Sequence, residues 1–527
     1  MTSHVVFHSL EEKTPLYFVL LALFILTLLF AAGLFIPTCD YIAFKYGQGL
    51  PPLAYGASLS ETHYSMYRYI TSLVDTLISW RGYDYFNLLG FWVVSLVAAL
   101  WLCTQECIRT IKLPNVCLPI LILSVGLHGF WAEFIQFPDG YLMYALALSA
   151  IGLALWCSRM YRHSPFIATI LITFWATITL MAYQAMILII LFVAILILIR
   201  DALCESNPKH QRTLQDIAPL LIGVCGSCIL FLIITRVMHS IMPGAIDRAY
   251  SFSLMDITKN IFAYILALPL LFFPKQNDIP YYFSFPLHER ILYGTAYGAA
   301  FFSLYYKKSL IPFIALMIGI LLMAGPMNIF IPGYFPTLRS MTPTAFFHSG
   351  LLLVLGLKGF EWVRTHYPIW AKERILLGIF LVMLALSGAN QLSILAERWR
   401  QYRQDYAIAS GIRSDLRVKK ALYPGSKVAV LAEKRSHIAQ LNRMLVMDFP
   451  ISAFSLSASP SEVAFLKSVS GIDVHHITHE TLLPYTQAPN ILFLYNALCS
   501  GSRPPWELRT VKDITLVCLP SLIKPHN

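Results

Sequence analysis

Apolar runs long enough to cross a lipid bilayer recur along most of this 527-residue chain. The first, LYFVLLALFILTLLFAAGLFI, covers about residues 16–36, and the last ends near Ser387. A helix needs roughly 20 apolar residues to cross a hydrocarbon core of about 30 Å. Only 13% of the residues are charged, against about a quarter in ordinary soluble domains. The sequence therefore predicts an α-helical polytopic membrane protein.

The charged links between the runs predict how the chain is oriented. The links at residues 104–114, 158–164 and 200–216 are basic, and the net charge is +11. Basic loops stay on the cytoplasmic side, and this topological bias accounts for the charge without nucleic acid as a partner. About eleven crossings follow, with the N-terminus in the cytoplasm and the C-terminus outside. In a bacterium this places the protein in the inner membrane and the opposite face in the periplasm.

Two apolar segments have lengths that do not fit one simple crossing. Residues 165–199 are apolar except for Tyr183 and Gln184 near the middle. About 35 residues would form a helix of roughly 50 Å, so a hairpin that turns at these two residues is favoured. The segment Ile261–Pro274 is barely long enough to cross and contains Pro269. We favour a re-entrant segment there, with a full crossing as the alternative.

The character of the chain changes near Asn390, which divides it into a membrane domain (1–389) and a C-terminal domain (390–527). A polar amphipathic helix follows this point. The stretches KVAVLAE, NILFLYN and DITLVCL then resemble short buried strands. We expect a small periplasmic α/β domain, in which Cys499 and Cys518 can pair if the compartment is oxidising.

Several familiar reaction types have no sequence signature here. The chain lacks Walker, GxGxxG, HExxH and GxSxG motifs, which argues against an ATP-driven pump and a lipase-like hydrolase. His475, His476 and His479 form an HHxxH cluster, but zinc needs a further ligand and a fixed geometry. We therefore interpret this cluster as a solvated segment and expect neither a metal nor a cofactor.

The polar segment 37–85, which follows the first run, holds two candidate catalytic bases. Asp40 lies just beyond the first span and Glu61 lies deeper in the loop. Sugar transfer to a hydroxyl needs a carboxylate that takes up the acceptor proton as the new bond forms. The sequence leaves the choice between Asp40 and Glu61 open.

Other polar residues predicted on the same outer face are candidates for binding substrate. A guanidinium binds phosphate through two hydrogen bonds, so we assign phosphate and donor binding to Arg68, Arg248 and Arg339. Carboxylates and amides bind sugar hydroxyls. Three polar residues lie at the outer ends of helix hairpins, where they either cap helices and form turns or contact the sugar; they are Asp139, Tyr183 and Gln184.

Five stretches in this order resemble the phage-type serotype-converting glucosyltransferases that modify O-antigen, a polytopic family of the GT-C type. They are the long first loop, FWAEFIQFPDGYLMYALALSAIGLAL, TLMAYQAMILIIL, FPTLRSM and NQLSILAERWRQYRQDYAIASGIRSDL. The resemblance covers roughly residues 15–416. It implies transfer of a sugar, often glucose, from a polyprenyl-phosphate donor to a surface polysaccharide at the periplasmic face, without a metal.

Two hypotheses from other classes stay open. A transporter or flippase for lipid-linked sugars would favour paired repeats and charged residues at mid-membrane. The sequence shows no repeat, and its charges cluster at the outer ends of the predicted spans. The other hypothesis is a scaffold of envelope assembly, in which the C-terminal domain is the docking module.

Overall fold

The computed structural model forms two compact units. Among the described residues, the first unit holds the helices up to Leu392, and the second holds Gly33, Leu34 and the residues from Ser393 onward. It describes residues 16–34, 68–81, 85–131, 135, 140–204, 210–241, 254–272, 287–324, 326, 341–366, 373–419, 427–432, 475–476, 482, 484, 486, 494–502 and 506–519.

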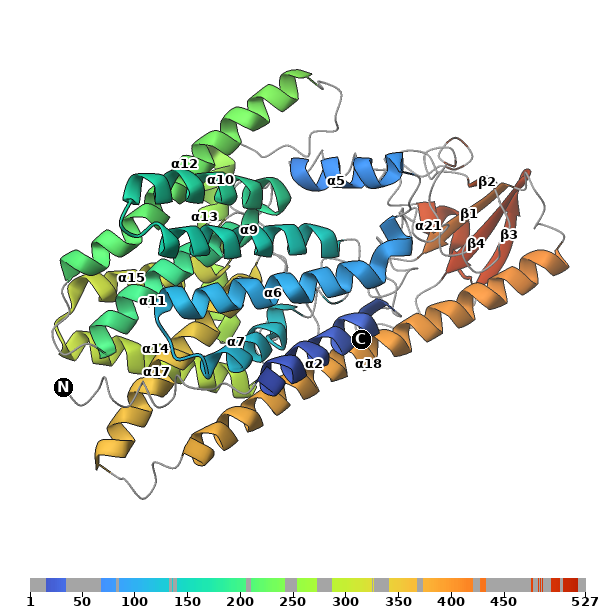
Figure 1. Cartoon of the computed structure of the whole chain (residues 1–527). Coiled ribbons are helices and arrows are strands. Elements are labelled where there is room, and N and C mark those ends of the chain that lie inside the picture. Colours follow the sequence, from blue (N-terminus) through green and yellow to red (C-terminus); the bar gives the residue numbers. More distant parts are fainter. Residues whose placement is uncertain are drawn as a thin grey trace. The chain divides into compact units, whose positions relative to one another are not determined.

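The first unit is a bundle of α-helices (Figure 1). Its helices are α2 (Leu16–Leu34), α5 (Tyr69–Trp80), α6 (Leu89–Ile111), α7 (Cys117–Gly126), α9 (Tyr141–Met160), α10 (Pro165–Ala182), α11 (Leu188–Cys204), α12 (His210–Ile241), α13 (Leu254–Phe272), α14 (Leu287–Tyr306), α15 (Leu310–Leu321), α17 (Thr344–His366) and the start of α18 (Glu373–Val418). Short 3₁₀ turns extend the bundle at η1 (Tyr85–Leu88), η2 (Gly129–Trp131), η4 (Gln184–Ile187) and η5 (Leu322–Ala324).

Five of these helices are long and apolar enough to cross a membrane, within the part of the chain that the structure describes. They cover Leu89–Ile111, Tyr141–Met160, Pro165–Ala182, Gln184–Cys204 and Leu214–Met238. The expectation of about eleven crossings was therefore too high by this criterion. Helices α7 and α15 have only 10 and 12 residues, because each apolar run ends in a 3₁₀ turn instead of one continuous helix.

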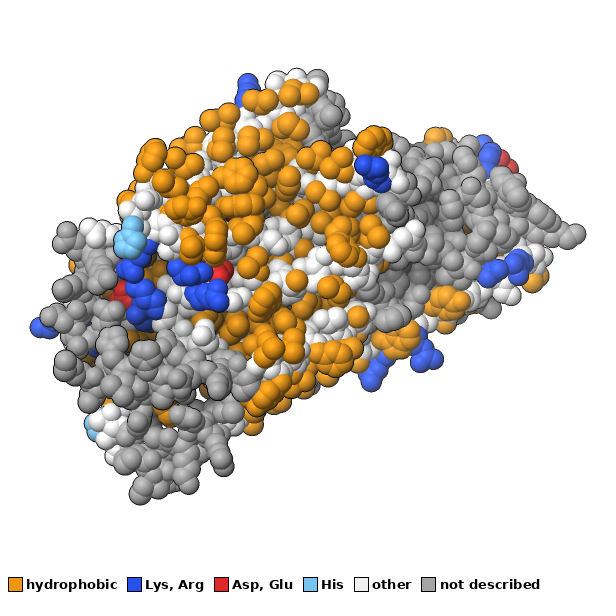
Figure 2. Space-filling view, in the orientation of Figure 1, with side chains coloured by type: hydrophobic (Ala, Val, Ile, Leu, Met, Phe, Trp, Pro, Cys, Tyr) orange, Lys and Arg blue, Asp and Glu red, His pale blue; other side chains and the backbone are white. Residues whose placement is uncertain are grey.

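Apolar side chains cover much of the surface of this unit. On α10, Phe166, Ile170 and Phe174 recur every four residues and are 76%, 52% and 53% exposed. Figure 2 shows apolar side chains spread over one face of the helices. An exposed apolar surface of this extent is typical of proteins that contact lipid. The helices therefore indicate a membrane-associated protein.

The long apolar run at residues 165–199 is interrupted where the sequence predicted. Helix α10 ends at Ala182, Tyr183 adopts an extended conformation with φ −156°, and η4 begins at Gln184. Helix α12 is the next described helix after α11, and its first turns lie beside the start of α10. The chain thus reverses direction at Tyr183, as predicted.

The basic links meet at one end of the bundle, which we call the basic end. Asp216 accepts hydrogen bonds from Lys112 at 3.4 Å and from Arg162 at 2.8 and 2.5 Å, joining the three predicted links. Lys307 donates to the carbonyl oxygens of Ala202 and Leu203 at 2.7 and 3.0 Å. Helix α14 therefore ends at the basic end, as the re-entrant interpretation of Ile261–Pro274 requires.

Close helix packing depends on small residues at the contacts. A Cβ atom at Gly152 of α9 would lie 2.9 Å from Leu102 of α6, and one at Gly223 of α12 would lie 2.5 Å from Ile172 of α10. Small residues at such contacts let helix backbones approach closely where van der Waals packing drives association. These contacts bring α6, α9, α10 and α12 together and position the loops at their ends.

The second unit contains a four-stranded sheet of order β2-β1-β4-β3. Strand β1 (Lys427–Ala432) pairs in parallel with β2 (His475–His476) and with β4 (Ile514–Leu519), whereas β3 (Glu507–Val511) is antiparallel to β4. A hydrogen bond from Lys427 lowers the pKa of Asp513. Strands at 427–432 and 514–519 match the sequence prediction.

The predicted strand NILFLYN was wrong from Leu494 onward, because Leu494–Cys499 forms helix α21. Tyr495, Leu498 and Cys499 have helical spacing and pack on one buried cluster with Leu431 and Leu516. A short apolar run carries too little periodicity to separate a buried helix from a strand. Packing against the sheet selects the helix.

Cys499 of α21 and Cys518 of β4 form a disulfide that closes a loop of 19 residues. Substitution of both cysteines by alanine is expected to lower the free energy of unfolding of this unit by about 3 kcal/mol, because the unfolded chain gains freedom. Pulse proteolysis of the full chain in urea would measure the change. A double alanine variant at Cys225 and Cys228, which are free cysteines on α12, is the control. Equal protease resistance of both variants would contradict the expectation.

Candidate functional site

The candidate site lies where α10 ends and α5 begins. The guanidinium carbon of Arg68 lies 5.2 Å from the centre of the Tyr183 ring, which is within the range of a cation–π contact. The hydroxyl of Thr71 lies 3.5 Å from the carbonyl oxygen of Ala182, the last residue of α10. The carbonyl groups at a helix C-terminus are partly negative, so a cation is favourable there. Arg68 is thus held over the break in the apolar run.

Helix α5 is amphipathic and positions Arg68 at its start. Its buried face carries Tyr69, Thr71, Ser72 and Asp75, and it packs on α9 and α10. Its other face exposes Leu73, Leu77 and Trp80, which are 54%, 49% and 76% exposed. A helix with an exposed apolar face suits the boundary between water and lipid. The polar segment 37–85 therefore includes an amphipathic helix suited to that boundary.

The aromatic wall of the site comes from two other elements. The Tyr144 ring of α9 meets the Tyr183 ring edge-on, with 5.4 Å between the centres. Tyr183 and Gln184 are both only 7% exposed. A cation, phenol rings and a buried amide together can bind a phosphate and sugar hydroxyls.

The structure brings together three of the residues predicted from the sequence. Arg68 contacts Tyr183, and Gln184 follows Tyr183 in the chain, although more than 100 residues separate Arg68 from these two. The other predicted site residues lie outside the described residues; they are Asp40, Glu61, Asp139, Arg248 and Arg339.

Asp75 is a buried carboxylate that the sequence analysis did not identify as a site residue. It is 3% exposed and lies on the same face of α5 as Ser72, two turns beyond Arg68. The signal was available, because residues spaced by three and four share one face of a helix. Asp75 is thus a third carboxylate candidate in this segment, beside Asp40 and Glu61.

A second polar cluster was missed altogether and lies inside the bundle. The ring nitrogens His128 Nε2 and His348 Nδ1 lie 2.9 Å apart, and both side chains are 1% exposed. The Tyr293 ring stacks on His348 at 4.2 Å. Gln391 of α18 donates to the carbonyl oxygen of His128 at 2.7 Å. We call these four residues the histidine cluster.

A buried carboxylate, Glu289, lies on α14 one turn before Tyr293. It is 0% exposed and accepts a hydrogen bond from Ser387 at 3.4 Å. An ionisable residue within an apolar helix is a site hypothesis in its own right, and that rule would have found Glu289 and His348. The pairing of His348 with His128 has no sequence signal, because 220 residues separate the two histidines.

No group of three or more His, Cys, Asp or Glu side chains suited to a metal occurs among the residues that the structure describes. His475 and His476 lie on β2, and His479 falls outside the described residues.

Comparison with known proteins provides no relative for this chain. No family model matches it, and neither the curated proteins nor the solved structures include a match. The resemblance to serotype-converting glucosyltransferases therefore stays a prediction from the motifs, and the functional argument depends on the site itself.

Proposed function

We propose that the protein is a membrane glycosyltransferase that moves a sugar, in this family often glucose, from a polyprenyl-phosphate donor to a surface polysaccharide such as O-antigen. The observation that carries the proposal is the placement of Arg68 over Tyr183, beside the buried Gln184. A cation at the end of an apolar bundle is where the phosphate of a lipid-linked donor would arrive.

The reaction assigns a distinct role to each group. Asp40 or Glu61 takes the proton of the acceptor hydroxyl as its oxygen bonds to the anomeric carbon of the sugar. The bond between that carbon and the phosphate oxygen breaks, and its electron pair leaves with the lipid phosphate. The Arg68 guanidinium stabilises the added negative charge. Gln184 and Tyr183 hold the sugar hydroxyls.

Two further features support a periplasmic site at the inner membrane of a bacterium. The basic end lies at the start of α10, and Arg68 lies at the other end of that helix. Under the positive-inside rule, this arrangement supports a periplasmic position for Arg68. The disulfide between Cys499 and Cys518 suits an oxidising compartment.

Surface glycan analysis tests the proposal through the candidate bases. Cells with the wild-type protein are expected to carry a sugar decoration that cells without it lack. Asp40→Asn or Glu61→Gln should abolish the decoration at matched expression, because the acceptor proton loses its base. Mass spectrometry of the polysaccharide measures the result and identifies the base. An unchanged glycan after deletion of the protein would contradict the proposal.

A transporter or flippase for lipid-linked sugars is the second candidate, and the buried polar groups inside the bundle favour it. Ionisable residues such as Glu289, His128 and His348 inside a membrane domain often mark a substrate or proton pathway. If deletion changes the glycan but neither carboxylate variant does, transport or a scaffold role gains the support that glycosyl transfer loses.

A further inference from the structure

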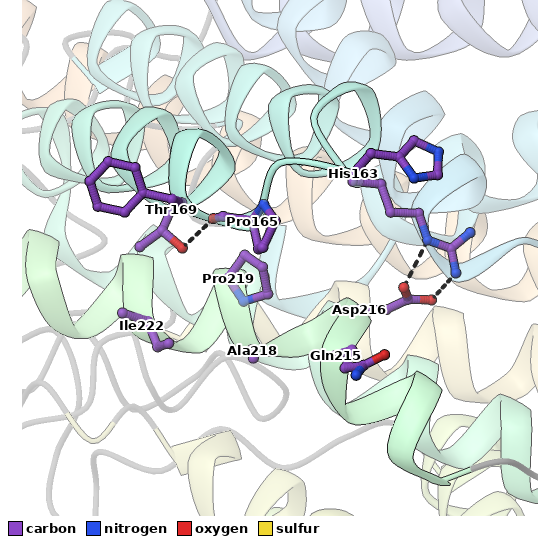
Figure 3. Close-up of a pocket in the computed structure, with 10 residues that line it drawn as sticks. His163, Pro165, Thr169, Gln215, Asp216, Ala218, Pro219 and Ile222 are labelled. Carbon is purple, nitrogen blue, oxygen red and sulfur yellow. Dashed lines mark hydrogen bonds and ion pairs between the residues drawn. The ribbon is translucent and has the colours of Figure 1, made fainter.

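A groove of about 770 Å³ lies at the basic end, between the start of α10 and the first turns of α12. Its lining includes Arg162, His163, Pro165, Phe166, Asp216 and Ile222. Figure 3 shows His163, Gln215 and Asp216 toward one end of the groove, and Ile222 toward the other. The groove is thus polar at one end and apolar at the other.

The polar end carries an excess of positive charge. Two basic side chains, Lys112 and Arg162, pair there with a single carboxylate, Asp216. Arg162 directs two of its N–H groups at Asp216, and a guanidinium has five. Lys112 and Arg162 are 46% and 37% exposed. The remaining donors are accessible to an anion.

The start of α10 adds to this field. The preceding Ser164 makes no side-chain capping bond, and Pro165 occupies the first turn. The first backbone N–H groups of a helix have no partner within it, and they favour negative charge. Thr169 donates to the carbonyl oxygen of Pro165 at 2.8 Å and therefore does not cap that end.

The apolar end opens onto the exposed apolar surface of the bundle. Phe166 and Ile222 are 76% and 58% exposed. The apolar spans of α10 and α12 begin at Pro165 and Leu214, so Arg162 lies just before one span and Asp216 lies in the first turn of the other. Charged side chains near the ends of membrane spans reach toward the lipid headgroups. Figure 2 shows basic side chains next to the apolar surface.

We propose that this groove binds one anionic phospholipid. Its phosphate accepts hydrogen bonds from Arg162 and Lys112, and its acyl chain lies along Phe166 and Ile222. Basic pockets between helices on the cytoplasmic side bind anionic headgroups in this way. The site lies at the opposite end of α10 from Arg68 and does not depend on the proposed sugar transfer.

Native mass spectrometry of the delipidated full-length protein in detergent tests the site with three probes: phosphatidylglycerol, phosphatidylcholine and glycerol 3-phosphate. We expect phosphatidylglycerol to bind, and Arg162→Gln to weaken it by about five- to tenfold, because a headgroup contact is lost. Ile222→Glu should also weaken it, since it places a charge beside the acyl chain. Lys112→Gln, which keeps the Arg162–Asp216 pair, tests the site if Arg162→Gln fails to fold.

The matched control is Arg236→Gln, which removes the same charge near the other end of α12, where Arg236 is exposed. It is expected to change binding by less than about twofold, because it leaves the groove intact. Equal binding of phosphatidylcholine would overturn the proposal, as would an equal effect of Arg236→Gln. Displacement of phosphatidylglycerol by equimolar glycerol 3-phosphate would show a site for soluble phosphate instead.

Discussion

Arg68→Ala is expected to slow sugar transfer by about 10²–10³-fold, the loss typical when one preorganised donor to a developing charge is removed. The guanidinium is held over Tyr183 before any substrate binds, so it needs no rearrangement as the phosphate departs. Arg68→Lys should show an intermediate rate, because it keeps the charge but loses the two-pronged hydrogen bond. The loss should appear in kcat more than in KM, since the charge develops during the reaction.

The measurement is the initial rate of transfer from a polyprenyl-phosphate sugar in membrane vesicles. Arg81→Ala is the matched control, because Arg81 follows the other end of α5 and makes a similar contact, 5.3 Å from the Trp80 ring. Its rate should stay within about twofold of wild type. If Arg68→Ala transfers sugar at the wild-type rate, Arg68 has no role in the reaction and the proposed site loses its central residue.

Glu106→Ala is expected to lower the free energy of unfolding by about 2–3 kcal/mol. The Glu106 carboxylate is 3% exposed and accepts hydrogen bonds from Arg109 at 2.9 Å and from Arg159 at 3.1 and 3.3 Å. Its removal leaves both arginines without this partner. The loss falls below the 3–5 kcal/mol typical of a fully buried pair, because the arginines are 43% and 35% exposed and can be hydrated.

Glu361→Ala is the control for this prediction. Glu361 pairs with Lys358 at the same sequence spacing of three as Glu106 with Arg109, but its side chain is 42% exposed. Its loss should cost less than about 0.5 kcal/mol, as is usual for a surface pair. Thermal unfolding of the two variants in the same detergent compares them. Equal melting temperatures would mean that burial of Glu106 contributes nothing to stability.

Features that depend on one segment at a time could be predicted from the sequence. The break at Tyr183 followed from the length of a single apolar run. The meeting of the basic links, seen in the pairing of Lys112 and Arg162 with Asp216, followed from the alternation of charged links and apolar runs. The strand at Lys427–Ala432 followed from a short apolar run that contains β-branched residues.

Features that depend on competition between segments could not be predicted. The length of an apolar run suggested a crossing at α7, yet its helix ends at Gly126 and the chain turns toward His128. The sequence from Leu494 onward predicts a strand, but packing against β1 and β4 favours a helix there. The histidine cluster depends on residues from four separate elements.

The sequence by itself determined the helical class, the apolar segments and the end at which the basic links gather. The free-energy cost of burying an unpaired charge in hydrocarbon is set by the residues of each segment, whichever helices later pack beside it. Only the tertiary structure decided that Arg68 covers Tyr183, that His128 meets His348 and that Arg162 borders a groove. These contacts join residues far apart in the chain, and they depend on which helix faces pack together, a choice that no single segment encodes.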